Sequence, residues 1–391
     1  MRRVIIDRNF SLCLSRHAVK SRVLASLTIQ LAAAQNLSAE QVQSAVALLT
    51  DERIPAPTKA NFLIALAQKG ETPAEIAAFA AALREKSVPP PLDAETRARE
   101  ILDIVGTGGD RLSTFNISTT AAILCAAAGV TVAKHGNRAV TSSVGSADVI
   151  EALGIKVNLS PADAARELKE KNFAFFFAPN FHPAFKHVAA ARKLCAERGQ
   201  RTIFNILGPL VNPARPSASL VGVPRPELCE PMAHALQLLG GRRGMVVCGS
   251  IGNCQLPIAN LLERDAAGSI GNRKLEIGNF LDELSSLGPT HLAEFYHERG
   301  FTKSVLSPEN FPLQPATLAD LHGGDKLANA EIIRRILRGD ERGPKRDAVL
   351  LNAGAGLFVA GKVRSLAEGW ELAGETIDGG KASAKLAELV G

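Results

Sequence analysis

Cysteine is scarce in this chain. Its 391 residues contain six cysteines, at positions 13, 125, 195, 229, 248 and 254, and no two of them form a CxxC pair. Six dispersed cysteines are too few to brace a chain of this length as a disulfide framework. We therefore expect each cysteine to be a small buried apolar residue rather than a ligand, and we expect the protein in a reducing cytoplasm.

Long apolar runs are also missing. The longest nearly uncharged stretch, residues 121–133, is shorter than the roughly 20 apolar residues that a transmembrane helix needs. It is better interpreted as a buried helix that runs into a strand. We therefore expect no membrane span. The 46% hydrophobic and 21% charged residues are typical of a globular protein, and the length allows two domains.

An excess of positive charge is absent from the body of the chain. Residues 1–22 contain six Lys or Arg residues against the single Asp7, so this basic leader supplies about five of the six net positive charges. The rest lacks the basic stripe that nucleic-acid binding needs. The leader has neither a Ser-rich amphipathic pattern nor an apolar core, which favours a dispensable or mis-started, poorly ordered N-terminus over targeting.

Residues 23–92 have the pattern of a small all-helical domain. Two capping boxes precede apolar runs with helical spacing, Ser38 with Gln41 and Thr72 with Glu75. The prolines at residues 89–91 cannot continue a helix and indicate a connection between domains. We expect a helical segment near residues 183–205 to join this domain.

Residues 93–391 change in character, because short apolar runs bounded by glycine alternate with longer helical patterns. The runs occupy residues 101–105, 131–133, 173–178, 220–223 and 245–248. This alternation predicts a larger α/β domain with a mostly parallel central sheet covered by helices. Ligands of such folds collect beyond the carboxyl ends of the strands.

One polar segment breaks this rhythm. The tripeptide Ile-Gly-Asn occurs at residues 251–253, 270–272 and 277–279. Joining residue 253 to residue 280 would leave a compact loop, so we interpret about 26 residues, 254–279, as an insertion. A mobile flap and a disordered surface loop are both compatible with it.

The motif GTGGD at residues 106–110 follows an apolar run and precedes the predicted helix at residues 117–127. Glycines at such a turn let backbone amides approach an anion, and the helix N-terminus adds partial positive charge. A diphosphate would fit there. A turn that is glycine-rich only for steric reasons is the alternative.

Hydroxyl groups begin that helix. The segment NISTT at residues 116–120 can donate to phosphate oxygens, and Ser118 can also reach a magnesium ion. Ordinary N-capping by Ser and Thr would need the same residues. The loop KHGNR at residues 134–138, together with TSSVGSAD at residues 141–148, offers two cations and several hydroxyls as a second anion site.

Five segments in order, GTGGD, NIST, KHGNR with GSAD, FNILGPLVNP and LDELSSLGPT, resemble the motifs of the anthranilate phosphoribosyltransferase family. The resemblance extends from about residue 24 to the C-terminus and is interrupted only by the insertion. It implies transfer of the phosphoribosyl group of phosphoribosyl pyrophosphate to the anthranilate nitrogen, in tryptophan biosynthesis. It also implies Mg²⁺ as cofactor and a homodimer formed through the N-terminal helices.

The resemblance also implies site residues. The phosphoribosyl pyrophosphate would be bound by Gly106, Gly109, Asp110, Thr114, Asn116, Ile117, Ser118, Thr119, Lys134, Ser142 and Ser146. The anthranilate would be bound by Gly106, Asn137, His182, Arg192 and Pro209. Mg²⁺ would be bound by Ser118 and by the adjacent carboxylates Asp282 and Glu283. A guanidinium such as that of Arg192 is a natural partner for the substrate carboxylate.

This chain departs from the family at two places. Many members carry Lys and then Ser where this chain has Ser143 and Val144, so the resemblance does not imply a direct cation contact from that loop in this chain. The insertion also enters just before Asp282 and Glu283, where its placement can shift the pair from the metal.

The implied mechanism needs little general-base help, since an aromatic amine is already nucleophilic. Stabilisation of the leaving diphosphate by Mg²⁺, backbone amides and Lys134 should dominate, with no covalent intermediate. A pyrimidine nucleoside phosphorylase is the nearest rival, but its Lys-His-Ser and Thr-Gly-Gly motif is absent. A non-catalytic nucleic-acid-binding relative of the same fold is the rival of another class.

Overall fold

The structure is a computed structural model that describes residues 8–139, 144–252, 280–297 and 300–391, with side chains from residue 20 onward. The proposed insertion, Ser142, Ser143 and the first seven residues of the leader lie outside the described residues. In the described part of the chain, no helix combines the length and the apolar composition that crossing a membrane requires.

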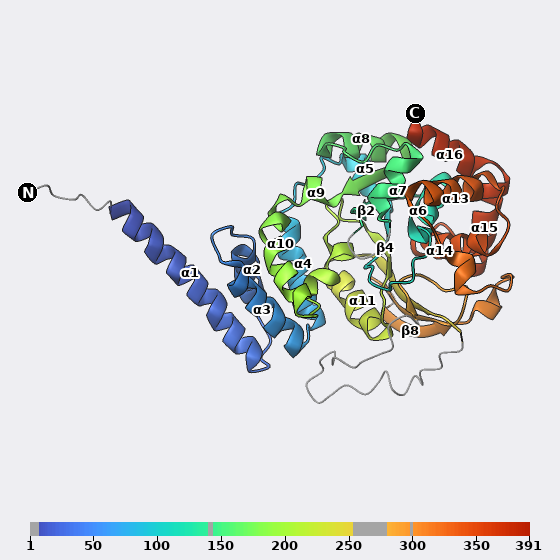
Figure 1. The fold of residues 1–391 in the computed structure, drawn as a ribbon. Coiled ribbons are helices and arrows are strands. Elements are labelled where there is room, and N and C mark those ends of the chain that lie inside the picture. The colour runs from blue at the N-terminus through green and yellow to red at the C-terminus, as the bar shows by residue number, and fades with distance from the viewer. Residues whose placement is uncertain (1–7, 140–143, 253–279, 298–299) are drawn as a thin grey trace, which may run out of the picture.

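An eight-stranded sheet forms the centre of the larger part of the molecule (Figure 1). Its strands run β3-β2-β1-β4-β5-β7-β8, and β6 pairs with β5 beside this path. The first five strands in this order are parallel, whereas β6, β7 and β8 are antiparallel to their neighbours. The strands are β1 Ile101–Gly106, β2 Thr131–Gly136, β3 Phe173–Phe177, β4 Ala218–Gly222, β5 Arg243–Ser250, β6 Phe280–Leu281, β7 Thr290–Tyr296 and β8 Gly300–Leu306.

Helices cover both faces of this sheet and build the smaller, all-helical part of the molecule. The helices are α1 Arg8–Ala32, α2 Ala39–Leu49, α3 Ala56–Lys69, α4 Pro73–Glu85, α5 Ala94–Ala98, α6 Ile117–Ala127, α7 Ser146–Leu153, α8 Pro161–Lys171, α9 Ala178–Phe181, α10 Ala189–Glu197, α11 Cys229–Leu238, α13 Lys326–Arg338, α14 Pro344–Val359, α15 Leu366–Asp378 and α16 Lys381–Val390. Short 3₁₀ helices include η1 Pro183–His187, η2 Ile203–Asn205 and η3 Gly208–Val211. The fold class predicted from the sequence, a helical part plus a mostly parallel α/β part, is confirmed.

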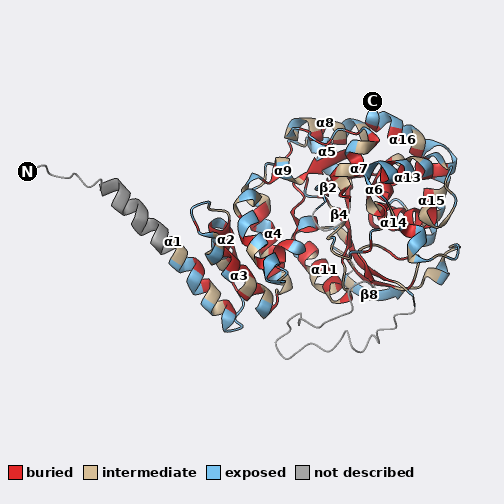
Figure 2. Ribbon diagram, viewed as in Figure 1, coloured by how far each residue is buried: buried red, intermediate tan, exposed pale blue. Residues whose placement is uncertain are grey.

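Alternation along the strands separates two apolar layers, one on each face of the sheet. Leu102 and Ile104 of β1 face α6, α7 and the C-terminal helices in one core cluster. Val221 of β4 and Val246 of β5 belong to the other cluster, with α11. Figure 2 shows the buried strands at the centre, with helices whose outer faces are exposed.

The helical part shares this second cluster. Both predicted capping boxes are present, at Ser38 before α2 and at Thr72 before α4. Helix α10 packs on α3, where the Lys59 ammonium donates to the His187 carbonyl at 2.7 Å. Apolar residues of α1–α4, α10 and α11 form one continuous cluster with the sheet. The exact domain limits stay a prediction.

The cysteines behave as small apolar residues where the structure describes them. Cys125, Cys195, Cys229 and Cys248 are buried and free, as predicted. Burial raises the pKa of the Cys125 and Cys229 thiols, so these groups stay protonated. The cytoplasmic location stays a prediction.

Candidate functional site

Loops after several strands converge at the carboxyl edge of the sheet. β1 ends at Gly106 and β4 at Gly222, and Asp282 follows β6 directly. A methyl group on Gly106 would come within 2.2 Å of the Asp282 Oδ2 atom. One on Gly222 would come within 1.6 Å of the Asp282 carbonyl oxygen. Glycine at both strand ends therefore lets the acidic residue approach the two backbones.

The glycine loop after β1 needs left-handed backbone conformations. Gly108 has φ 72° and Gly109 has φ 92°, values that side chains disfavour. The Gly108 N–H donates to the Asp282 Oδ2 atom at 2.6 Å, and the Gly109 carbonyl accepts from Arg201 at 3.4 Å. The loop therefore exposes an amide that binds a carboxylate oxygen in this structure, as the motif predicted for an anion.

The acidic pair lies against the start of α6 as well as the glycine loop. The Ser118 N–H donates to the Glu283 Oε1 atom at 3.1 Å. Burial raises the pKa of Asp282 well above its usual value, and the neighbouring charges of Asp110 and Glu283 raise it further. Burial likewise raises the pKa of Glu283 to about 7 and also raises that of Asp110. Three half-buried carboxyl groups that repel one another form a site that a positive charge would stabilise.

Lys134 is a buried cation that interacts electrostatically with this group. Its side chain is 1% exposed, and its ammonium donates to the Ile104 carbonyl at 2.6 Å. Burial lowers the pKa of Lys134, while the negative charges of Asp103, Glu283 and Asp282 oppose that shift. Lys134 therefore lies within the charge network of the acidic pair rather than in open solvent.

The first turn of α6 holds the remaining residues predicted for the donor. The Asn116 side chain donates to the Val144 carbonyl at 3.3 Å and accepts from Asn329 at 3.0 Å. Ile117 and Thr119 are buried, and Thr114 forms an isolated bridge with His322. The polar groups of Asn116 are thus used to join α6, the loop before α7, and α13.

The second predicted loop packs closely on itself. A methyl group on Gly136 would come within 2.2 Å of the Ser146 Oγ atom, and one on Gly145 within 2.3 Å of the Ala139 nitrogen. The Ser146 hydroxyl donates to the Asn137 carbonyl at 3.4 Å. Ser146 and Asn137 therefore lie together at the end of β2, as predicted, whereas Ser142 lies outside the described residues.

A row of rings connects His182 and Arg192, two of the five residues predicted for the acceptor. His182 stacks on Phe185 with ring centroids 4.8 Å apart, and Phe185 meets Phe204 edge-on at 5.9 Å. The Arg192 guanidinium lies 5.6 Å from the centre of the Phe204 ring. Among the described residues, no carboxylate forms an ion pair with Arg192, and burial lowers its pKa. An aromatic wall that ends in an unpaired guanidinium suits a planar aromatic acid.

His135 extends this row, although no role was assigned to it from the sequence. Its ring lies 5.3 Å from that of His182, and its Nδ1 atom is 3.1 Å from the Gly208 carbonyl, next to the buried Pro209. Successive side chains of a strand point to opposite faces, so Lys134 and His135 serve different groups of residues. The residue type in KHGNR was the only available signal.

The two buried histidines predict a pH dependence of stability. Burial lowers the pKa of His135 to about 3 and that of His182 to about 4, from 6.5. Between these values and pH 6.5 the unfolded chain binds more protons, so stability falls as the pH falls, by roughly 1.4 kcal/mol per unit for each histidine. Urea unfolding at pH 6.5 and pH 5 should show a smaller difference for His182→Gln than for the wild type.

The exposed His297 provides the control, since His297→Gln should leave that difference unchanged. An equal difference in the wild type and His182→Gln would contradict a neutral buried His182. Carboxyl groups such as Glu283, whose pKa is raised, change stability with pH in the opposite direction. Their contribution is the same in every variant, so it cancels when the variants are compared at the same two pH values.

The donor set fits a divalent cation. Asp282, Glu283 and Ser118 offer the oxygen ligands that Mg²⁺ prefers, and a cation would relieve the repulsion among the three carboxyl groups. Within the described residues, no three His, Cys, Asp or Glu side chains form a complete metal site by themselves. The remaining ligands would therefore come from water and from the phosphates of a substrate.

Comparisons with known families agree with this geometry. Residues 25–87 match a family model described as the helical bundle domain of a glycosyl transferase family. Residues 98–263 and 273–383 match the a/b domain of a glycosyl transferase family.

Individual relatives point to one activity. The chain is 44% identical over 356 residues to the anthranilate phosphoribosyltransferase of Petrotoga mobilis, covering 91% of this chain and 93% of the relative. It is similar to the crystal structure of the Thermus thermophilus enzyme of that name, with TM-score 0.78, 40% identity, and 93% and 98% of the two chains covered. The Saccharomyces cerevisiae enzyme in complex with PRPP and Mg gives TM-score 0.77 at 27% identity, with 94% and 96% covered.

Proposed function

The chain belongs to the anthranilate phosphoribosyltransferase family, and we propose that the carboxyl edge of its sheet binds the phosphoribosyl donor while the aromatic row binds anthranilate. The activity is that of a pentosyltransferase. It transfers the phosphoribosyl group from phosphoribosyl pyrophosphate to the anthranilate nitrogen and releases pyrophosphate. Neither a phosphorylase nor a nucleic-acid-binding relative accounts for this identity over nine tenths of the chain.

One observation carries the assignment of the donor site. Asp282 and Glu283 lie against the amides of Gly108 and Ser118, so the acidic pair, the glycine loop and the start of α6 form one site. These amides carry partial positive charge and hold carboxylate oxygens in this structure, the same kind of anionic oxygen that a phosphate presents. Gly106 and Ser118 of the proposed donor residues lie directly against this acidic pair.

Mg²⁺ is the proposed cofactor of this site. Asp282, Glu283 and the Ser118 hydroxyl would hold it, and it would neutralise negative charge on the departing diphosphate. The complex of the yeast relative with PRPP and Mg supports the proposal. Lys134 would add a positive charge that interacts with the same carboxylates.

The acceptor residues would position the amine rather than activate it. The wall of His182, Phe185 and Phe204 would hold the ring of anthranilate, and Arg192 would bind its carboxylate. His182 has a lowered pKa and a buried Nε2 atom without a hydrogen-bond partner among the described residues. A neutral ring there can accept a hydrogen bond from the amine. Asn137 and Pro209 would complete the acceptor side.

Replacing Arg192 tests the acceptor site. Arg192→Ala should raise the KM for anthranilate roughly 10- to 100-fold, the value of a charge-assisted pair, and Arg192→Lys should have an intermediate effect. The KM for the donor should change little. Steady-state kinetics with each substrate varied in turn would measure both, with Lys193→Gln on the same helix as the control. An equal rise in both KM values would show a general structural effect instead.

A fluorescence assay tests the whole proposal. Anthranilate should disappear only when phosphoribosyl pyrophosphate and Mg²⁺ are both present. Consumption without the donor, or no consumption with both present, would contradict the proposed reaction.

We also propose a homodimer through the N-terminal helices. Val23 and Ile29 of α1 are 42% and 72% exposed, so this helix presents apolar side chains to solvent. Sedimentation equilibrium should give twice the chain mass of 41.3 kDa. A single species at the chain mass would exclude it.

A further inference from the structure

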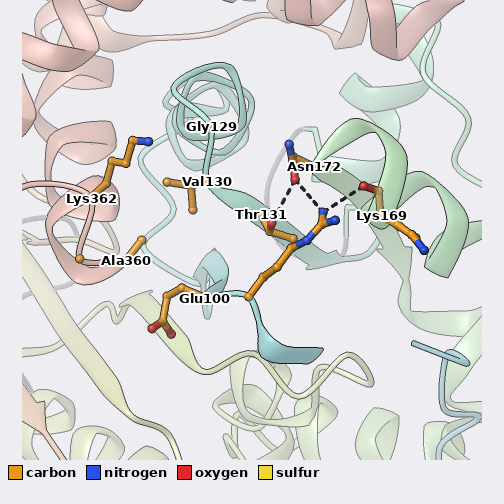
Figure 3. A pocket seen from close by; sticks show the side chains of 10 residues that line it. Glu100, Gly129, Val130, Thr131, Lys169, Asn172, Ala360 and Lys362 are labelled. Atoms are coloured by element: carbon orange, nitrogen blue, oxygen red, sulfur yellow. Dashed lines mark hydrogen bonds between the residues drawn. The ribbon is translucent and has the colours of Figure 1, made fainter. Parts of the chain in front are cut away.

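Two cavities lie at the amino edge of the sheet, opposite the proposed active site. The first has a volume of about 470 Å³ and is lined by residues that precede β1, β2 and β3. Two of its cations already have partners within the protein. Arg99 donates to the Asn172 side chain and to the Lys169 carbonyl, and Lys169 forms an ion pair with Asp93 at 2.7 Å. Figure 3 shows Asn172 and Lys169 with the hydrogen bonds drawn to them. This cavity therefore has little need of a charged ligand.

The second cavity, of about 550 Å³, lies between α4 of the helical part and the loops before β1, β4 and β5. It is lined by four arginines, Arg84, Arg97, Arg215 and Arg242, and by one carboxylate, Glu85. Four separate segments of the chain therefore place positive charge around this one cavity.

Three of these arginines form no ion pair with a carboxylate among the described residues. The Arg84 Nε–H donates to the Leu210 carbonyl and an Arg97 N–H to the Ala214 carbonyl, each at 2.7 Å. Arg242 forms an ion pair with Glu100 at 3.0 Å. No ion pair in the described part of the chain includes Arg84, Arg97 or Arg215. A guanidinium has five N–H donors, so most of the hydrogen-bonding capacity of these three groups remains for a ligand.

The arginines also oppose one another electrostatically. Burial lowers the pKa of Arg84 to about 10, and the positive charge of Arg215 lowers it further, while the negative charge of Asp103 opposes the shift. Burial and Arg215 likewise lower the pKa of Arg97. Arg215 has φ 52°, a left-handed conformation that is unfavourable for a non-glycine residue. The fold therefore tolerates like-charge repulsion and a strained backbone beside this cavity, and a bound anion would offset the repulsion.

We propose that this second cavity binds a phosphate-type oxyanion, held by Arg84, Arg97 and Arg215, at a site separate from the catalytic edge. Guanidinium groups match the oxygens of such an anion in pairs. The volume accommodates inorganic phosphate or the phosphate group of a small metabolite. Because α4 belongs to the helical part and Arg215 to the α/β part, the anion bridges the two.

Calorimetric titration of the full chain with inorganic phosphate tests the site. The double variant Arg97→Gln with Arg215→Gln should bind phosphate at least roughly 10-fold more weakly than the wild type, since two charge-assisted contacts are lost. Lys362→Gln is the matched control, because this exposed cation lines the first cavity and should leave the affinity unchanged. Equal affinity of wild type and double variant would overturn the proposal.

A second measurement does not depend on a variant that folds. Wild-type crystals soaked in tungstate should give an anomalous peak among Arg84, Arg97 and Arg215. A peak only at the catalytic edge, or at scattered lattice positions as an adventitious ion only, would overturn the proposal. Phosphoribosyl transfer is read separately by anthranilate fluorescence, so failure here leaves the proposed function untouched.

Discussion

Replacing Asp282 by Asn together with Glu283 by Gln should lower kcat/KM roughly 1,000-fold and, in magnesium-free buffer, raise the melting temperature. The loss of activity follows because the uncharged Asn and Gln side chains would not hold a divalent cation next to the departing diphosphate. The gain in stability follows because burial and mutual repulsion raise the pKa of both carboxyl groups in the folded chain. Ionising such groups near neutral pH destabilises the folded state, and the neutral amides remove that effect.

A second adjacent acidic pair provides the control. Asp340 and Glu341 follow the end of α13, and neither lies in the proposed site. Asp340→Asn with Glu341→Gln should leave kcat/KM and its magnesium dependence unchanged. If the Asp282 and Glu283 double variant kept the wild-type magnesium dependence, these carboxylates would not hold the metal. Lys134 keeps Asp103 as a negative neighbour in that variant, so it does not become an isolated buried charge.

Gly106→Ala should reduce kcat/KM by roughly 100-fold or more while the protein remains folded. The new methyl group would meet the Asp282 Oδ2 atom at 2.2 Å and its Cγ atom at 2.9 Å. A carboxylate at the end of a side chain can rotate away, so the main effect is a displaced ligand rather than an unfolded chain. A misplacement of about 1 Å in a reacting site can cost on the order of 100-fold in rate.

Gly374→Ala is the matched control for this substitution. Gly374 lies inside α15, and the nearest atom to its added methyl group is the Arg346 Nη2 at 4.0 Å. Activity should be unchanged and stability should rise by about 0.5–1 kcal/mol, as for glycine replaced by alanine in a helix. Near-normal turnover by Gly106→Ala, at saturating and at limiting Mg²⁺, would show that the position of Asp282 is not critical.

Local patterns in the sequence sufficed for much of the fold. Helix α6 has the bounds that were predicted for it, residues 117–127, and the five predicted apolar runs are the five parallel strands β1–β5. Buried parallel strands are nearly continuous apolar runs, which is why they were recognisable. The antiparallel strands β7 and β8 were missed. β8 is mostly exposed, and its place depends on pairing with β7, which no local pattern records.

The same distinction applies to the site. Motifs that directly follow strands could be placed at one edge of the sheet, because parallel strands end on the same side. The contact of Asp282 with Gly108 joins residues 174 positions apart and could be expected only through the family resemblance. Two other features depend on side-chain packing between separate segments, for which the sequence has no periodic signal. They are the row of rings from His182 to Arg192 and the second cavity with its four arginines.

The apolar cluster common to the bundle and the sheet limits how this polypeptide can be dissected. Phe62 and Phe79 of the bundle belong to the same buried cluster as Val221, Val246 and Phe295 of the sheet. A cut within the proline run would expose part of this apolar cluster to solvent on both fragments. Exposing apolar surface costs about 25 cal/mol of free energy for each Å². Each fragment expressed alone should therefore aggregate, and a split version should regain solubility only when both pieces are produced together.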